Sequence, residues 1–195
     1  MYRRSRNSLL LLPYPDQQRQ TGQDRKREEQ EREEDMKARI REVEQRDNAA
    51  VEAIIRYCLK EYSGDHEGTA WCDPDLGRFS EIYGTPQMRY WVAEDETGTI
   101  VGGAGYGPLP GRPGVCELQK MYTLPAARGT GVAHALVEKV LEEAGRHYDL
   151  CYLETFGNMK RAQRFYEKHG FVRSDAPMGS TGHIACDVFF AKPLK

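Results

Sequence analysis

The sequence predicts a mixed α/β fold, in which a central mixed sheet carries helices on both faces. Two patterns lead to this fold class. Between residues 90 and 106, two strand-like segments flank a turn at Gly98, as in a hairpin of antiparallel strands. From Val115 onward, strand-like and helix-like segments alternate, which is typical of units with parallel strands. A hairpin followed by such units indicates one sheet that combines both strand directions.

The folded pattern occupies residues 36–195. Residues 17–35 consist almost entirely of charged and amide side chains, so they have little apolar surface whose burial could offset the entropy of ordering. We therefore expect residues 1–35 to be a charged, disordered extension, and residues 36–195 to form one domain. A solvated tail is favoured over a binding arm for a partner, and Met36 is a candidate start of the native chain.

The first part of the domain is expected to form one strand and two helices. Apolar and polar residues alternate over residues 38–43, which predicts a strand. Residues 47–62 repeat apolar side chains with helical spacing, and Asp47 or Asn48 is placed to cap this helix. Residues 76–83 form a short second helix.

The rest of the domain is expected to supply the other strands and two longer helices. Residues 131–146 place apolar side chains on one face and charged side chains on the other. Residues 158–169 form the second helix, with Asn158 as its cap and Gly170 as its stop. The remaining strands are expected at residues 90–95, 100–106, 115–124, 150–155, 171–173 and 186–192.

Composition excludes several classes of protein. The formal net charge is −2, so no general attraction to nucleic acid or to an anionic membrane is expected. The longest aliphatic run, Leu9–Leu12, is too short to span a bilayer. The five cysteines are scattered without CxxC spacing, and the histidines lack metal-ligand spacing. We expect a cytoplasmic protein with no disulfide and no metal.

A glycine-rich turn opens the clearest helix of the chain. A strand runs to Pro125, and the segment Arg128–Gly131 (Arg-Gly-Thr-Gly) leads directly into the helix. Such a turn presents backbone N–H groups and the positive end of the helix dipole to one point, which suits a phosphate or pyrophosphate. The chain has no Gly-Lys-Ser/Thr ending and no GxGxxG fingerprint, so neither a P-loop nor a dinucleotide fold is supported. The second glycine cluster, residues 102–107, would let a substrate or a neighbouring strand pack closely.

The residues of this turn resemble a known family signature. Arg128–Ala133 matches the R/Q-x-x-G-x-G/A motif of the GNAT acyl-CoA N-acetyltransferases, with alanine in the last position. Residues 151–171 resemble the next strand and helix of that family, with Asn158 and Tyr166 in the usual places. Over residues 36–195 the chain is similar to small bacterial acetyltransferases that act on small amines or amino-acid-like compounds. The resemblance implies a GNAT fold whose mixed sheet is mostly antiparallel.

The implied reaction is acetyl transfer from acetyl-CoA, as co-substrate, to the amino group of a small-molecule acceptor by direct attack in a ternary complex. Three alternatives remain at this stage. They are an acyl-CoA-binding module without catalysis, O-acetylation of a small hydroxyl compound, and an interaction protein that acts through its charged tail. Whether the protein is a monomer or a homodimer also stays open.

The resemblance assigns the cofactor contacts. The backbone of Met121, Tyr122 and Thr123 would pair with the pantetheine arm, and one N–H there would polarise the thioester carbonyl. The other contacts would lie around the pyrophosphate and along the following helix: Arg128, Gly129, Thr130, Gly131, Val132, Ala133, His134 and Asn158.

The resemblance also implies the proton carriers. Tyr166 would be the general acid that protonates the leaving thiolate. Glu117 is the first choice for the general base, with Glu154 and His183 as the other candidates. His183, Glu154 and Trp71 would line the acceptor pocket. Asp73, in the same long loop as Trp71, favours an acceptor with a cationic group, as does the nearby Asp75.

Overall fold

The computed structural model describes residues 38–179 and 181–195. The extension expected at residues 1–35 lies outside the described residues. The described residues belong to one compact unit that spans Asp35–Lys195. In the described part of the chain, no helix is both long enough and apolar enough to cross a membrane.

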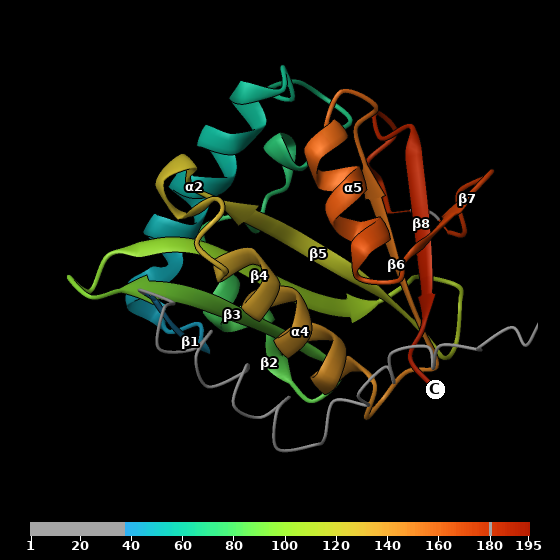
Figure 1. Cartoon of the computed structure of the whole chain (residues 1–195), viewed down its shortest axis with the longest axis horizontal. Coiled ribbons are helices and arrows are strands. Elements are labelled where there is room, and N and C mark those ends of the chain that lie inside the picture. The colour runs from blue at the N-terminus through green and yellow to red at the C-terminus, as the bar shows by residue number, and fades with distance from the viewer. Residues whose placement is uncertain (1–37, 180) are drawn as a thin grey trace, which may run out of the picture. The chain divides into compact units, whose positions relative to one another are not determined.

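One mixed sheet forms the centre of this unit (Figure 1). The strands lie in the order β1-β3-β4-β5-β6-β8-β7, and the short β2 pairs with β3. Only the β5–β6 pair is parallel among the pairs of described strands. The strands are β1 (Ala38–Glu42), β2 (Gly84–Thr85), β3 (Met88–Asp95), β4 (Ile100–Pro108), β5 (Val115–Thr123), β6 (Leu150–Thr155), β7 (Val172–Ser174) and β8 (Val188–Pro193).

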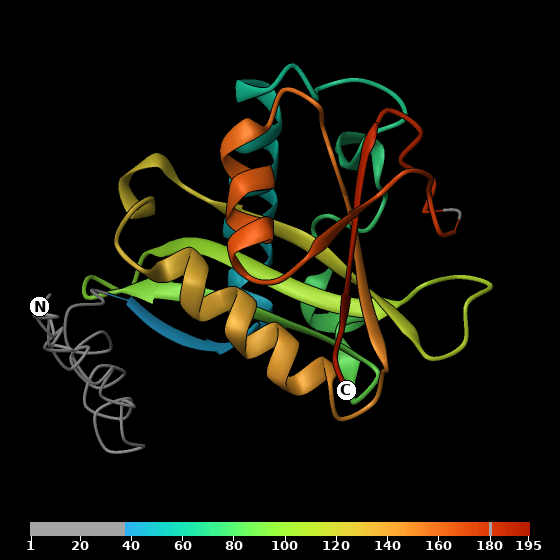
Figure 2. The ribbon, with the colours of Figure 1, turned by 45° about the vertical axis from the view of Figure 1, so that its right-hand side comes forward.

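Helices cover both faces of the sheet. The helices are α2 (Asn48–Glu61), α3 (Phe79–Ile82), α4 (Val132–Ala144) and α5 (Lys160–Lys168). Ile55 of α2 and Phe79 of α3 belong to one apolar cluster, whereas Leu136 of α4 and Tyr166 of α5 belong to another. Figure 2 shows α4 and α5 in front of the sheet and α2 behind it. The predicted mixed sheet with helices on both faces is therefore confirmed.

The two parallel strands separate after a short common stretch. β5 and β6 pair only at Val115–Leu150, Cys116–Cys151 and Glu117–Tyr152. Beyond Glu117 the strands run apart, as Figure 1 shows. The second half of β5 therefore has an edge that β6 does not cover, and this edge faces the gap between the strands.

A bulge in β5 lies at the start of this gap. Two steps along β4, from Gly103 to Gly105, match three steps along β5, from Tyr122 to Gln119. The extra residue is accommodated around Lys120, which adopts the left-handed conformation (φ +51°), an uncommon one for a residue with a side chain. The hydroxyl of Tyr90 donates a hydrogen bond of 2.9 Å to the Lys120 carbonyl and holds the bulge in place.

The glycines of β4 leave room for the side chain of Tyr90. A Cβ at Gly103 or Gly105 would lie 2.6 Å or 2.5 Å from the side chain of Tyr90. Of the two explanations for this glycine cluster, close packing by a neighbouring strand is therefore the one that the structure supports at these positions.

The predicted helix caps are wrong in detail. Asp47 occupies the N-cap position of α2, but its carboxylate accepts from Arg41 and from the Glu44 N–H instead of from the first turn of the helix. Helix α5 begins at Lys160 without a side-chain cap, and the Asn158 amide donates to the Tyr62 carbonyl at 3.0 Å. Both side chains form hydrogen bonds with groups outside the helix that they were expected to cap. These hydrogen bonds replace the capping interaction with the first turn. The short helix expected at residues 76–83 is limited to α3.

Candidate active site

The glycine turn before α4 leaves an open space in front of the helix. Gly129 and Gly131 have φ angles of +85° and +90°, which disfavour any other residue. A Cβ at either position would meet no atom within 4 Å. The first hydrogen bond of the helix is donated by Ala135 to the Gly131 carbonyl, so the N–H groups of the preceding three residues have no acceptor four residues back. The turn therefore offers several donors to a ligand anion in that space.

The side chains of the turn point in other directions. The guanidinium of Arg128 forms an ion pair with Glu61 of α2 and donates to the Thr123 carbonyl at 3.2 Å. The Thr130 hydroxyl donates to the Ala127 carbonyl at 2.7 Å. In this structure Arg128 joins α2 to the turn, and the backbone supplies the contacts that remain free for an anion.

His134, in the first turn of α4, contacts α5. Its Nδ1 lies 2.7 Å from Nε2 of His169, and its Nε2 lies 3.0 Å from a carboxylate oxygen of Glu138. His169 in turn contacts the Phe165 carbonyl through Nδ1 at 2.8 Å. The side chain of His134 thus links the start of α4 to the end of α5. Val132 and Ala133 come directly after the turn, and their backbone N–H groups are among those without an acceptor four residues back.

The segment Met121–Thr123 lies on the uncovered edge of β5. Because β6 leaves β5 after Glu117, the backbone of this segment has no partner strand on that side. It also leads within a few residues to Gly129 and Gly131. An extended ligand arm could pair here like an added strand, with its anionic end at the start of α4.

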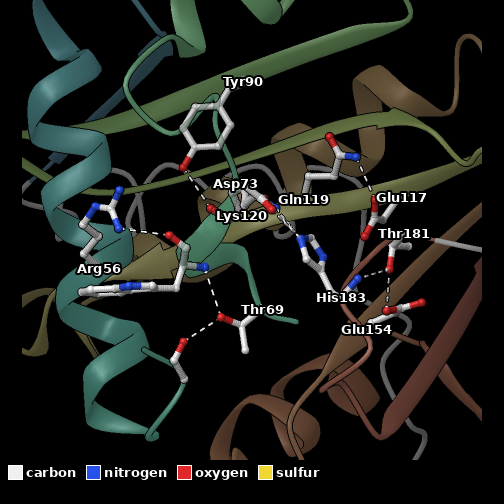
Figure 3. A network of polar contacts seen from close by, with 12 residues as sticks. Arg56, Thr69, Asp73, Tyr90, Glu117, Gln119, Lys120, Glu154, Thr181 and His183 are labelled. Atoms are coloured by element: carbon white, nitrogen blue, oxygen red, sulfur yellow. Dashed lines mark hydrogen bonds and ion pairs between the residues drawn. The ribbon is translucent and has the colours of Figure 1, made fainter. Parts of the chain in front are cut away.

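A cavity of about 60 Å³ opens beside this edge and brings together all three candidates for the general base. Glu117 of β5, Glu154 of β6 and His183 of the loop before β8 all line it, together with Lys120 and Tyr122. Figure 3 shows the carboxylates and the imidazole grouped around Lys120 and Gln119. The cavity thus occupies the place where β5 and β6 separate.

Glu117 is the most buried of these polar groups, with 7% of its surface exposed. Burial raises the pKa of its carboxyl, against the lowering effects of the Gln119 amide and of nearby Lys120 and His183, and Glu154 raises it further. The Gln119 amide donates to Oε2 at 2.8 Å. No hydrogen bond reaches Oε1 from the described residues, so this oxygen is free to take a proton from a ligand.

Both carboxylate oxygens of Glu154 have protein partners. The Tyr152 hydroxyl donates to Oε1 at 2.8 Å, and the Thr181 hydroxyl donates to Oε2 at 2.8 Å. These neutral donors fix the carboxylate without cancelling its charge.

His183 is held by a residue from the other side of the cavity. Its Nε2 lies 3.1 Å and 3.2 Å from the oxygens of Asp73, and Lys120 Nζ lies 2.6 Å from Asp73 Oδ2. Burial tends to raise the pKa of Asp73, but hydrogen bonds and charge from His183 and Lys120 outweigh it, so that pKa is lowered. The sequence had pointed to His183 and Asp73, but no pattern indicated Lys120, because its role follows from the bulge.

Tyr166 lies on the apolar face of α5, packed against Phe171 and Phe190. Its hydroxyl makes no hydrogen bond with the described residues. The residue is 8% exposed, and it is not among the residues that line the cavity. Burial raises its pKa, with Cys151 and Cys186 adding to the effect. The phenol therefore keeps its proton at ordinary pH, as a general acid must.

Three other predicted residues do not line the cavity. The ring of Trp71 packs under Arg56 and Lys60 of α2, at 4.8 Å and 5.3 Å, and is not among the residues that line the cavity. Asn158 lines a second, wider hollow of about 220 Å³ together with Asp187, and this hollow shares Phe156 with the cavity. Asp75 pairs with Arg78 on the surface.

The histidines, cysteines and carboxylates of the described residues form no group of three that could hold a metal ion. Cys186 lines the cavity, but burial and the two nearby glutamates raise its pKa to about 12, so it remains a neutral thiol.

The sequence matches the acetyltransferase (GNAT) family over residues 48–171. It is 40% identical over 158 residues to YjgM, an uncharacterized N-acetyltransferase of Escherichia coli, which covers 80% of this chain and 94% of the relative. A GNAT-family acetyltransferase from Staphylococcus aureus matches the fold with a TM-score of 0.71 at 23% identity, over 81% of this chain and 99% of that one. The protein yncA from Salmonella typhimurium, solved with its cofactor acetyl-CoA, gives a TM-score of 0.64 at 20% identity, over 81% and 94% of the two chains. The family match includes the glycine turn and both strands beside the cavity, and the chain therefore belongs to the GNAT family of acetyltransferases.

Proposed function

We propose that this enzyme transfers the acetyl group of acetyl-CoA to the amino group of a small-molecule acceptor, by direct attack while both substrates are bound. The observation that carries the proposal is Glu117, a buried carboxylate with a raised pKa and a free oxygen. It faces a cavity beside the uncovered edge of β5. A carboxylate with a raised pKa is a stronger base than an ordinary glutamate, and is therefore better suited to take a proton from an ammonium group.

The residues present fit acetyl-CoA. The open space in front of Gly129 and Gly131 and the free N–H groups at the start of α4 suit the pyrophosphate. The uncovered backbone of Met121–Thr123 suits the pantetheine arm, whose thioester would then lie beside the cavity. When bound, acetyl-CoA supplies the activated acetyl group.

The proton transfers can be assigned to residues of this chain. A protonated acceptor amine gives its proton to Oε1 of Glu117, directly or through a water molecule. The freed nitrogen attacks the thioester carbonyl, an N–C bond forms and the C–S bond breaks. The nitrogen loses its second proton as the amide forms, and this proton restores the one that Tyr166 gives away. A backbone N–H of Met121–Thr123 stabilises the negative charge on the oxygen, and Tyr166 gives a proton to the departing sulfur.

Glu117 is favoured over the other two candidates because of their contacts. Both oxygens of Glu154 accept hydrogen bonds, and His183 faces Asp73. The name of the E. coli relative also supports an amine as acceptor over a hydroxyl group.

The test is to incubate the enzyme with acetyl-CoA and a panel of small amines and alcohols, and to measure free thiol. Amine-dependent release of coenzyme A, with the acetylated amine identified by mass spectrometry, is the expected result. Tight binding of acetyl-CoA without release on any acceptor would contradict the proposal and indicate a binding module.

A further inference from the structure

The charges around the cavity are not balanced. Two carboxylates, Glu117 and Glu154, line it, and neither forms an ion pair within the described residues. Buried or half-buried carboxylates without a counter-charge are costly, and that cost is relieved when a ligand brings a cation. Glu117 is more than nine-tenths buried and keeps one oxygen free toward the cavity.

The basic side chains that line the cavity already have an acidic partner. Lys120 and His183 both contact the carboxylate of Asp73, which comes from the opposite loop (Figure 3). With both glutamates ionised, these five groups carry a net negative charge whether His183 is neutral or protonated. The described residues that line the cavity therefore leave places for positive groups and offer no free cation for the carboxylate of an amino-acid-like acceptor.

The size of the cavity limits the ligand. A volume of about 60 Å³ corresponds to roughly four to six water-sized groups, since one such group occupies about 10–15 Å³ on this scale. A chain of about four carbons with an amine at each end fills that space. The parallel pairing places Tyr152 beside Glu117, and the Tyr152 hydroxyl holds Glu154, so the two carboxylates are neighbours along this wall.

We propose that the acceptor of this enzyme is a short diamine, whose first amine reacts beside Glu117 while Glu154 binds the second as an ammonium ion. This inference rests on the acetyl transfer proposed above and names the class of its acceptor. The first ammonium loses one proton to Glu117 and forms the N–C bond as the C–S bond breaks. Its nitrogen gives up a second proton as the amide forms, and this proton balances the one that Tyr166 gives to the leaving thiolate. The second ammonium keeps all its protons and donates to the remaining lone pairs of the Glu154 carboxylate. No further reactant is needed.

Three acceptors of nearly equal length test the inference: 1,4-diaminobutane, butylamine and γ-aminobutyrate. They end in an ammonium, a methyl and a carboxylate group. One charge-assisted hydrogen bond contributes about 1.5–3 kcal/mol, so kcat/KM for the diamine should exceed that for butylamine by at least about tenfold. The value for γ-aminobutyrate should be lower than that for butylamine.

The possible outcomes separate this inference from the proposed function. Acetylation of butylamine and the diamine at equal rates, or a preference for γ-aminobutyrate, would overturn the diamine inference and leave acetyl transfer standing. Release of coenzyme A with none of these three amines would also overturn the diamine inference, and only failure of the whole panel of amines and alcohols would overturn acetyl transfer as well.

A substitution then locates the second binding group. In Glu154→Gln the side chain keeps its size but loses its charge, so the ratio of kcat/KM for diamine to butylamine should fall to near one. Because the ratio compares two acceptors in the same enzyme, partial loss of folded protein does not change it. Glu81→Gln, which removes a surface carboxylate paired with Arg78, is the matched control and should keep the wild-type ratio. An unchanged ratio in Glu154→Gln would overturn the assignment.

Discussion

The proposed cofactor side and the proposed acceptor side of this site are built in different ways. The cofactor side is a continuous segment, the turn from Arg128 to the first residues of α4, and it offers backbone N–H groups. The acceptor side gathers side chains from four separate segments, and it offers charge: Glu117, Glu154, His183 and Asp73. The first depends on two glycines and a helix end, and the second depends on how strands and loops pack.

This difference predicts how each side responds to substitution. Blocking a backbone site requires only that a side chain be added in front of it, so one substitution can remove binding altogether. A set of charges is removed one group at a time, and each loss should alter the rate or the choice of acceptor while the cofactor still binds.

The largest effect is expected for Gly131→Val. A branched side chain would fill the space in front of α4 and force a β-branched residue to φ +90°. Loss of two charge-assisted hydrogen bonds, each about 1.5–3 kcal/mol, should weaken acetyl-CoA binding by at least about 10²-fold, which calorimetry would measure.

Gly111→Val is the matched control for the backbone cost. Gly111 lies between β4 and β5, has φ +75° and also has no atom within 4 Å of an added Cβ. Both variants should lose similar stability, about 1–3 kcal/mol for the strained conformation, but only Gly131→Val should lose binding. Equal affinities in the two variants would show that the turn does not hold the cofactor.

The next largest effect is expected for a substitution on the acceptor side. Glu117→Gln should lower kcat by about 10²- to 10³-fold and leave acetyl-CoA affinity unchanged, because only the base is lost. Single-turnover kinetics and calorimetry on the same sample would separate the two quantities. Glu81→Gln serves as the control that keeps the wild-type rate.

The pH profile adds a second readout for Glu117. The base works when deprotonated, so the rate should fall as the pH drops through its pKa. An ordinary glutamate has a pKa of about 4.3. Because burial raises the pKa of Glu117, the rate should fall at a higher pH than that value. This limb should vanish in Glu117→Gln. A limb that persists would assign the base to another group, such as Glu154 or His183.

The same contrast explains what the sequence could and could not predict. The turn before α4 is local, so its glycines and the amphipathic helix were visible in a single segment. The strands and helices followed from short-range periodicity, and most of them lie within a few residues of the predicted ranges. The caps at Asp47 and Asn158 were wrong because partners distant in sequence or outside the helix compete for those side chains.

The acceptor side was predictable only as a set of candidate residues. Glu117, Glu154 and His183 stood out as ionisable groups on strands and in a loop, but their meeting in one cavity depends on the separation of β5 and β6. Lys120 had no sequence signal, because its orientation comes from a bulge held by Tyr90. Trp71 was expected at the acceptor, yet α2 supplies two cations over its ring and it packs there.

A smaller effect than that of Glu117→Gln is expected for Tyr166→Phe, which tests the proposed general acid. The ring and its packing remain, so acetyl-CoA should still bind. Loss of the proton donor should lower kcat by about 10²-fold at saturating substrate. Tyr148→Phe, which removes a hydroxyl elsewhere in the same apolar cluster, should keep the wild-type rate.

The chemistry of the thiolate sets the alternative outcome for Tyr166. An ordinary thiol has a pKa of about 8.5, so water could protonate the leaving group. A loss of only a few-fold, with chemistry shown to be rate-limiting, would make Tyr166 a packing residue. Burial raises its pKa, so its ionisation should cause no fall in rate at moderately alkaline pH in the wild type.

The smallest change in rate, together with a modest change in specificity, is expected for Asp73→Asn. Asp73 pairs with Lys120 and His183, whose side chains are 13% and 15% exposed. Without this carboxylate, Lys120 becomes a free cation in the cavity wall. The value of kcat/KM for γ-aminobutyrate, relative to butylamine, should therefore rise by about two- to fivefold, the scale of a partly exposed ion pair.

Stability provides the control for Asp73→Asn. Its loss should lower the free energy of unfolding by about 1 kcal/mol at neutral pH, as measured by urea denaturation. The pKa of Asp73 is lowered in the folded protein, so its stabilising effect is complete above the ordinary aspartate pKa of about 3.9 and is lost as the pH falls through the lowered value. The difference between wild type and variant should therefore close in strong acid. A variant that loses stability but keeps the wild-type order of acceptors would show that Asp73 fixes the loops together without masking the charge of Lys120, and the preference for cationic acceptors would then need another cause.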